Sequence, residues 1–127
     1  MILVDTSVWV DHLRRGNDEL AKLLVDDQVL CHPLVVGELA CGRLTDREEI
    51  LARLQALPQA LAVEYREALR FIDMHRLMGA GLGWVDVNLL ASAALSAAAL
   101  WSFDRSLVTA VRRLGLAPRT VSAPPRS

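Results

Sequence analysis

The sequence predicts an α/β fold, a three-layer α/β/α arrangement built on a central, mostly parallel sheet. Three short apolar runs without polar alternation are typical of strands buried on both faces, and they span residues 2–4, 29–31 and 99–102. Helical segments separate these runs, and strands that alternate with helices form a parallel sheet covered on both faces. The length of 127 residues suits one domain. We therefore expect a single domain over residues 1–127, with a loose tail from about residue 122.

The N-terminal strand leads directly into a helix. Thr6 and Ser7 supply N-cap chemistry for this helix, and Gly16 ends it. Asn17 caps a second helix that ends near Val25. The next expected elements are a turn at residues 26–28, the strand at 29–31, and a helix at 34–41 with Pro33 at its first position and Gly42 after its end.

Capping residues and a proline divide the second half of the chain. Residues 45–48 (Thr-Asp-Arg-Glu) have the composition of a capping box, so they predict a helix to about residue 57, which Pro58 ends. Residues 61–63 are predicted as an edge strand. The remaining expected elements are helices at 64–78, 84–97 and 106–114, a glycine-rich loop at 79–83, the strand at 99–102, and a last strand at 119–121.

The composition excludes several classes of protein. The longest weakly polar run covers residues 89–100, and a membrane span needs about 20 apolar residues, so we expect no membrane insertion. Nothing resembles a secretion signal. Cys31 and Cys41 fit neither a disulfide framework nor a zinc spacing, and we expect both to be small core residues of a reduced, cytoplasmic protein. The hydrophobic content of 53% is high and favours an oligomer.

The charge pattern gives less direct information. A formal net charge of −1 is not that of a protein that holds nucleic acid by bulk attraction. Residues 105–127, however, contain five arginines and no acid. This segment is either a phosphate-facing patch or an ordinary solvated surface.

Two aspartates follow buried strands. Asp5 comes directly after the first strand, and Asp104 repeats its position after the strand at 99–102. Open α/β sheets place their ligands at the carboxyl ends of parallel strands, so both aspartates are site candidates. The alternative for each is a helix N-cap. Ser102 should point to the same side as Asp104 and could hold a metal-bound water.

Two further acids are expected to face inward from helices. Glu38 shares a helical face with Leu34 and Val35, and Asp86 heads an apolar stripe in the first turn of its helix, where the helix dipole favours an acid. The alternatives are a partly exposed glutamate at the edge of the stripe and a first-turn cap. Four clustered carboxylates repel one another unless a cation joins them, and a site of oxygen ligands suits Mg²⁺ or Mn²⁺. Among the histidines, His32 could lie near the rim of this site.

The motifs around these acids together resemble the PIN domain. They are Met-Ile-Leu-Val-Asp-Thr-Ser-Val-Trp with Asp5, the helix with Glu38, Gly-Trp-Val-Asp with Asp86, and Leu-Trp-Ser-Phe-Asp with Asp104. More narrowly, the chain resembles the VapC-type toxins of type II toxin–antitoxin pairs. The similarity runs from residue 1 to about residue 116, and no motif acid is missing.

The resemblance implies that these four acids are the catalytic, metal-binding residues, with Thr6 and Ser102 in support. It implies a Mg²⁺-dependent endoribonuclease that hydrolyses RNA through an activated water, with Mn²⁺ as a substitute. It also implies a homodimer and a small antitoxin that blocks the site. Ser102 stands where the family has threonine or serine, and Leu107 occupies the position of an apolar residue that follows the last aspartate.

Two other functions remain open from the sequence. A phosphotransfer or receiver domain also places aspartates at strand ends, but it needs a lysine after a later strand, and the only lysine is Lys22. A non-catalytic PIN-like module would recruit partners through its apolar surface. Such a module would be recognised in the sequence by the loss of one of the four motif acids.

Overall fold

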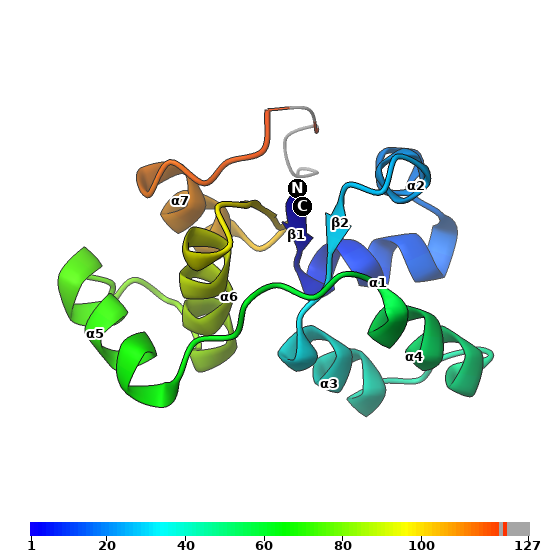
Figure 1. The fold of residues 1–127 in the computed structure, drawn as a ribbon, viewed down its shortest axis with the longest axis horizontal. Coiled ribbons are helices and arrows are strands. Elements are labelled where there is room, and N and C mark those ends of the chain that lie inside the picture. Colours follow the sequence, from blue (N-terminus) through cyan, green and yellow to red (C-terminus); the bar gives the residue numbers. More distant parts are fainter. Residues whose placement is uncertain (120, 122–127) are drawn as a thin grey trace.

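The computed structural model describes residues 1–119 and residue 121, and its centre is a parallel sheet (Figure 1). The strands are β1 (Ile2–Val4), β2 (Val29–Leu30) and β3 (Ala99–Trp101), in the order β2-β1-β3. Both neighbours pair with β1 in parallel. Since β1 is the central strand, the carboxyl ends of all three strands lie at the same edge of the sheet.

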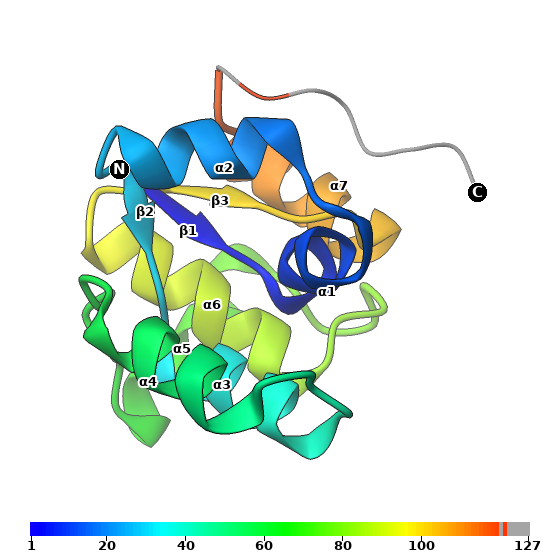
Figure 2. The same cartoon turned by 90° about the vertical axis from the view of Figure 1, so that its right-hand side faces the viewer.

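Helices cover both faces of this sheet. Figure 2 shows α2 and α7 on one side of the strands, and α6 on the other side with α3 and α4 beyond it. The helices are α1 (Thr6–Arg15), α2 (Asp18–Val25), α3 (Pro33–Cys41), α4 (Arg47–Ala56), α5 (Tyr65–His75), α6 (Trp84–Leu95) and α7 (Arg105–Arg113). The predicted fold class, α/β with a central parallel sheet, is therefore confirmed.

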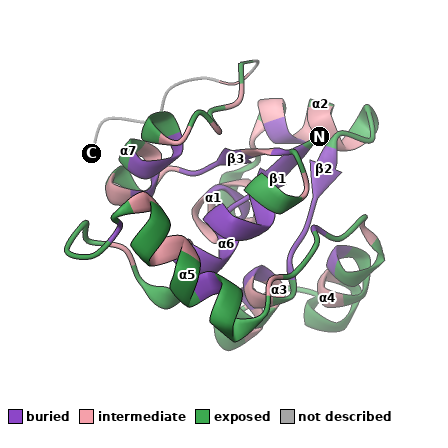
Figure 3. Ribbon diagram, turned by 60° about the vertical axis from the view of Figure 1, so that its left-hand side comes forward, coloured by how far each residue is buried: buried purple, intermediate pink, exposed green. Residues whose placement is uncertain are grey.

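A large part of the core lies between the sheet and α6. Leu3 and Val4 of β1 and Leu89 and Leu90 of α6 are fully buried, and α6 contacts both β1 and β3. Figure 3 shows α6 buried along most of its length, in contrast to α5, which is exposed on its outer side. Because α6 is fixed against the central strand, its first turn is held at the carboxyl edge of the sheet.

The predicted edge strand at residues 61–63 is wrong. The chain does pair beside β2, but earlier, through an isolated parallel bridge between Cys31 and Gln59. Cys31 N donates to Pro58 O, and Ala60 N donates to Cys31 O. From residue 61 the chain turns to another partner, because Leu61 N donates to the side chain of Ser96 at 2.9 Å. Apolar composition indicated an extended segment there and could not tell which residues would pair.

The capping box predicted at residues 45–48 is also wrong. Asp46 precedes α4 with φ 52° and ψ 46°, a left-handed conformation, and its side chain makes no capping hydrogen bond. An N-cap residue needs an extended backbone to direct its side chain at the first turn. The prediction that Cys41 is a core residue is wrong as well, because Cys41 is exposed whereas Cys31 is buried.

The C-terminal predictions fall partly outside the described residues. Arg119 and Val121 are bends, not strand residues, and Thr120 lies outside the described part. The loose tail from about residue 122 also lies outside it, so the single domain with its tail stays a prediction. Within residues 1–119 and 121, no helix is long and apolar enough to span a membrane.

His32 has a structural role in the interior. Its Nδ1 accepts a hydrogen bond from Leu34 N at 3.0 Å, which caps α3, and its Nε2 lies 3.1 Å from Ser92 Oγ on α6. Only 3% of the residue is exposed. Since Nδ1 is an acceptor, the neutral ring carries its proton on Nε2 and donates it to Ser92. The expected rim residue is therefore a buried link between α3 and α6.

We expect the contribution of His32 to the stability of the protein to fall as the pH is lowered below about 6.5. Burial lowers the pKa of His32, so the unfolded chain binds the proton more tightly. The stability that the neutral ring contributes is complete above the unfolded pKa and is lost as the pH falls through the lower folded pKa. Urea unfolding between pH 8 and pH 5 should show this loss in the wild type and a smaller loss in His32→Asn. A loss of the same size in both proteins would contradict it. His75→Asn, which removes a half-exposed histidine, is the control.

Candidate active site

Asp5 lies at the carboxyl end of the central strand and is 5% exposed. Its carboxylate does not cap α1. Instead, Oδ2 accepts one hydrogen bond from Ser7 Oγ and one from Ser102 Oγ, both at 2.7 Å. The alternative of a simple helix cap is therefore excluded for Asp5. Two short bonds fix the orientation of a carboxylate that the fold has largely removed from water.

The same two hydroxyl groups connect Asp5 to the segment after β3. Ser7 Oγ accepts from Phe103 N, and Ser102 Oγ accepts from Asp104 N, each at 2.9 Å. A donated and an accepted bond at each hydroxyl join the ends of β1 and β3 into one unit. From the sequence, Ser7 was expected only to cap a helix. Its position two residues after Asp5 was a usable signal, because serine often bonds to nearby groups on its own chain.

Asp104 begins α7 and is exposed. Its Oδ1 accepts from Leu107 N at 3.0 Å, so the N-cap alternative is correct for this oxygen. Within residues 1–119 and 121, the other carboxylate oxygen has no hydrogen bond. Asp104 therefore has one oxygen that fixes its position and one that faces outward, toward a ligand or solvent.

The charges of the other three acids all act on Asp86. It lies half-buried in the first turn of α6, where its Oδ2 accepts from Gly83 N at 3.0 Å. Burial raises its pKa, and the charges of Asp5, Asp104 and Glu38 raise it further, against the lowering effect of the Gly83 hydrogen bond. The other three predicted acids thus lie near enough to Asp86, at one edge of the sheet, for their charges to act on its carboxyl group.

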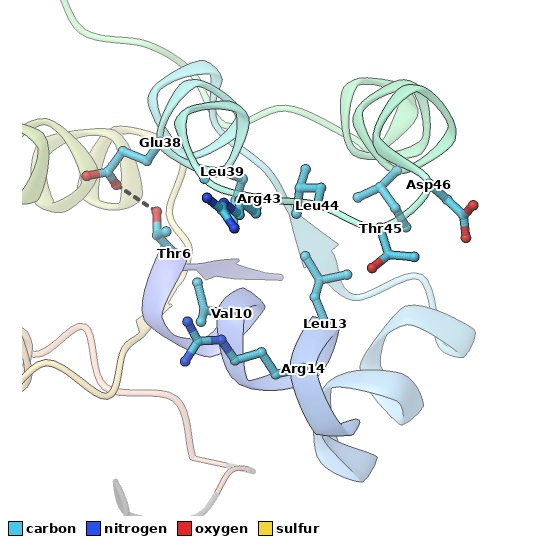
Figure 4. A pocket seen from close by; sticks show the side chains of 12 residues that line it. Thr6, Val10, Leu13, Arg14, Glu38, Leu39, Arg43, Leu44, Thr45 and Asp46 are labelled. Carbon is cyan, nitrogen blue, oxygen red and sulfur yellow. Dashed lines mark hydrogen bonds between the residues drawn. The ribbon is translucent and has the colours of Figure 1, made fainter.

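Glu38 approaches this edge from α3. Its side chain is exposed, so the expectation that it faces the interior is wrong and the alternative of a stripe-edge glutamate is correct. It is nevertheless held, because Thr6 Oγ1 donates to Glu38 Oε1 at 2.7 Å (Figure 4). Thr6 is the first residue of α1, directly after Asp5. This bond therefore fixes the carboxylate of Glu38 at the start of the helix that Asp5 precedes.

The glycine-rich loop before α6 packs against the start of α7. Gly81 has φ +78°, and a Cβ built on it would lie 2.9 Å from Ser106 Oγ. Only glycine fits at position 81 without a shift of Ser106, because other residues rarely adopt this backbone conformation and a Cβ would come too close to the serine. The loop ends at Gly83, whose amide binds Asp86. Close packing of this loop therefore sets the first turns of α6 and α7, which carry Asp86 and Asp104, relative to each other.

The chemistry of the four acids suits a divalent cation. All of their ligand atoms are oxygen, and in the described part of the chain no arginine, lysine or histidine forms an ion pair with any of them. Residues 1–119 and 121 contain no three acidic, histidine or cysteine side chains close enough to form a ready-made metal site. Each of the four acids is held in its place by a hydrogen bond, and their charges repel one another. A cation would offset the repulsion.

Comparisons with known proteins agree with this arrangement. The family model described as PIN domain matches residues 2–112, which include all four acids, Ser7 and Ser102. Ribonuclease VapC32 of Mycobacterium tuberculosis (strain CDC 1551 / Oshkosh) is 48% identical over 118 residues, which are 92% of this chain and 95% of that protein. Ribonuclease VapC32 of strain ATCC 25618 / H37Rv shows the same identity and coverage.

Proposed function

The chain belongs to the PIN domain family, and on this basis we propose that it is a VapC-type toxin that cuts RNA as a metal-dependent endoribonuclease. The observation that carries the proposal is the coupling of Asp86 to the other three acids at one edge of the sheet. The likeness to two proteins named ribonuclease over nearly their full length supports the same activity. All four acids are present, which disfavours a non-catalytic binding module. No lysine other than Lys22 is available for a phosphotransfer site.

Asp5, Glu38, Asp86 and Asp104 would hold Mg²⁺, or Mn²⁺ in its place. When bound, such an ion lowers the pKa of a water and stabilises the charge that develops on the phosphate. The chain's own residues prepare the ligands. Ser7 and Ser102 orient Asp5, the Gly83 amide holds one oxygen of Asp86, and Thr6 holds Glu38. Because the pKa of Asp86 is raised, protons compete with the cation as the pH falls, and activity should decrease toward acid pH.

The test is cleavage of RNA by the purified protein, freed of any antitoxin. With Mg²⁺ or Mn²⁺ it should cut structured RNA, and EDTA should stop the reaction until excess metal is restored. Cleavage that continues undiminished in EDTA would contradict the proposal. The melting temperature is a second readout. Because a cation binds the acids only in the folded protein, the melting temperature should rise as the metal concentration is increased.

An apolar surface on α5 supports the proposal of a homodimer. The buried side of this helix carries Ala68, with Phe71 and Ile72 packed against the core. Its outer side and its surroundings expose several large apolar side chains, namely Leu61, Tyr65, Leu69, Met74, Met78 and Trp84. An apolar area of this kind on a protein surface marks an interaction site. Light scattering at micromolar concentration should give the mass of two chains, and a monomer mass would count against the dimer.

We also propose a small antitoxin as the cytoplasmic partner of the toxin. Among the described residues the four acids have no cationic partner, so the cluster is well suited to an arginine, whose planar guanidinium pairs with two carboxylates at once. The antitoxin would insert an arginine or a basic segment among the four acids, while apolar contacts supply most of its affinity. Antitoxin variants that lack single basic residues should still bind, and one of them should fail to inhibit. If all of them inhibit, the antitoxin blocks RNA in another way.

A further inference from the structure

A groove opens beside Glu38, between α1, the end of α3 and the start of α4 (Figure 4). It has a volume of about 500 Å³, and its apolar surface consists of Val10, Leu13, Leu39, Leu44 and Ile50. Thr6 and Glu38, joined by their hydrogen bond, stand at one end, with Thr45 and Asp46 at the other. The groove therefore begins at the candidate active site and leads away from it.

Two arginines of this groove carry charges that no acid in the described part of the chain pairs with. Arg14 lies on α1 and Arg43 follows the end of α3, and both line the groove. Figure 4 places both guanidinium groups toward the end with Thr6 and Glu38. In residues 1–119 and 121 neither arginine has an ion-pair partner, whereas the neighbouring Arg15 is paired with Asp11 at 2.6 Å. These two guanidinium groups can therefore bind an anion, such as a substrate that has to approach the neighbouring acids.

We propose that the RNA strand on one side of the cut runs along this groove, with backbone phosphates bound by Arg14 and Arg43. The inference rests on the proposed function, since a strand cut at the four acids must continue beyond them. Guanidinium groups bind phosphate oxygens in a bidentate manner, and such contacts set the register of a nucleic acid. The apolar surface between the arginines receives ribose and base. The volume is that of a small-molecule pocket, which suits a few unpaired nucleotides and not a duplex.

The two arginines are positioning residues in this proposal. They bind the strand beside the scissile bond, so their removal should raise KM and leave kcat nearly unchanged. A phosphate contact also makes binding depend on salt, and for a single strand the slope of log K against log salt should become shallower by about 0.7 for each arginine removed. A purely structural role would move neither the salt slope nor the ratio of KM to kcat in this way.

The experiment compares Arg14→Gln, Arg43→Gln and the double variant with Arg53→Gln. Arg53 is the matched control, because it has the same charge but lies on the outer side of α4 and is paired with Glu49. Binding of labelled single-stranded RNA is measured in an Asp86→Asn background, in which cleavage should be slowed roughly 100-fold or more. We expect the double variant to bind roughly tenfold more weakly, with a shallower salt slope. Arg53→Gln should bind as before, and the variant with Arg14→Lys and Arg43→Lys should keep part of the affinity that the double Gln variant loses.

Substrate length supplies a second arm. RNAs that extend beyond the cut on one side should lose affinity in the double variant, and RNAs that end at the cut on that side should not. Unchanged binding and an unchanged salt slope for all RNAs would overturn the inference. If the double variant instead fails to bind the antitoxin while it binds RNA normally, the groove is a protein docking site and the inference is again overturned. Absence of cleavage by the wild type with any metal would refute the proposed function alone, because the binding arm needs no cleavage.

Discussion

Asp86→Asn is expected to reduce RNA cleavage roughly 100-fold or more, and to raise the melting temperature of the metal-free protein. The substitution keeps the size of the side chain and the acceptor for Gly83 N, but it removes one ligand charge. In the absence of metal that charge is unfavourable, because burial and three neighbouring acids all raise the pKa of Asp86. A carboxyl whose folded pKa lies above its unfolded pKa destabilises the fold at neutral pH, so its neutralisation should be stabilising.

The prediction holds only if the variant both cuts RNA more slowly and melts at a higher temperature without metal. Cleavage rates at saturating metal and melting curves in EDTA measure the two effects separately. Asp18→Asn, at an exposed acid in α2, is the matched control and should cut RNA at the wild-type rate. If Asp86→Asn melts lower than the wild type in EDTA, the repulsion among the acids is not the dominant effect. If it cuts RNA normally, Asp86 is not part of the site.

Ser102→Ala is expected to lower the apparent metal affinity or the activity by about 10- to 100-fold, although Ser102 is not an acid. The hydroxyl donates to Asp5 Oδ2 and accepts from Asp104 N, so its removal takes away one of the two hydrogen bonds that orient Asp5 and leaves the partly buried amide of Asp104 without this partner. Because the defect is one of position, higher metal concentrations should restore part of the rate. Ser102→Thr keeps the hydroxyl group and should retain most of the wild-type cleavage rate.

The control for this prediction is Ser96→Ala, which removes a hydroxyl that binds Leu61 N away from the acids. Both alanine variants lack a hydrogen bond to the main chain, so both are expected to be somewhat less stable than the wild type. Only Ser102→Ala should shift the metal dependence of cleavage. A rate titrated against Mg²⁺ that is the same in both variants would show that the serine bonds do not position the site.

The sequence was informative where local pattern and position in the sheet determine the structure. The three apolar runs become β1, β2 and β3. Asp5 directly after β1 and Asp104 shortly after β3 lie at one edge because parallel strands end at the same edge of a sheet. Glycine and asparagine at helix ends were equally direct signals. Gly16 follows α1, and Asn17 caps α2 by accepting from Leu20 N.

The sequence was less informative where a distant partner decides. Ser7 has the local chemistry of a capping residue, and the bond that it accepts from Phe103 N depends on β3 lying beside β1. Asp46 has the type of residue that caps a helix, but the turn from α3 to α4 forces it into a left-handed conformation. His32 resembled a polar residue near the site, whereas its partner is Ser92 on α6. In each case the deciding contact or constraint arises from the tertiary fold.

The bonds from Ser7 and Ser102 to Asp5 also have a consequence for synthesis of the protein. Ser102 and Asp104 are added nearly 100 residues after Asp5. At about 5–20 residues per second, that interval lasts several seconds or longer. During this time the nascent chain lacks β3 and the segment after it, which supplies the Ser102 bond to Asp5 and the fourth acid, Asp104. The proposed nuclease site can therefore not be complete before translation of the chain is nearly finished.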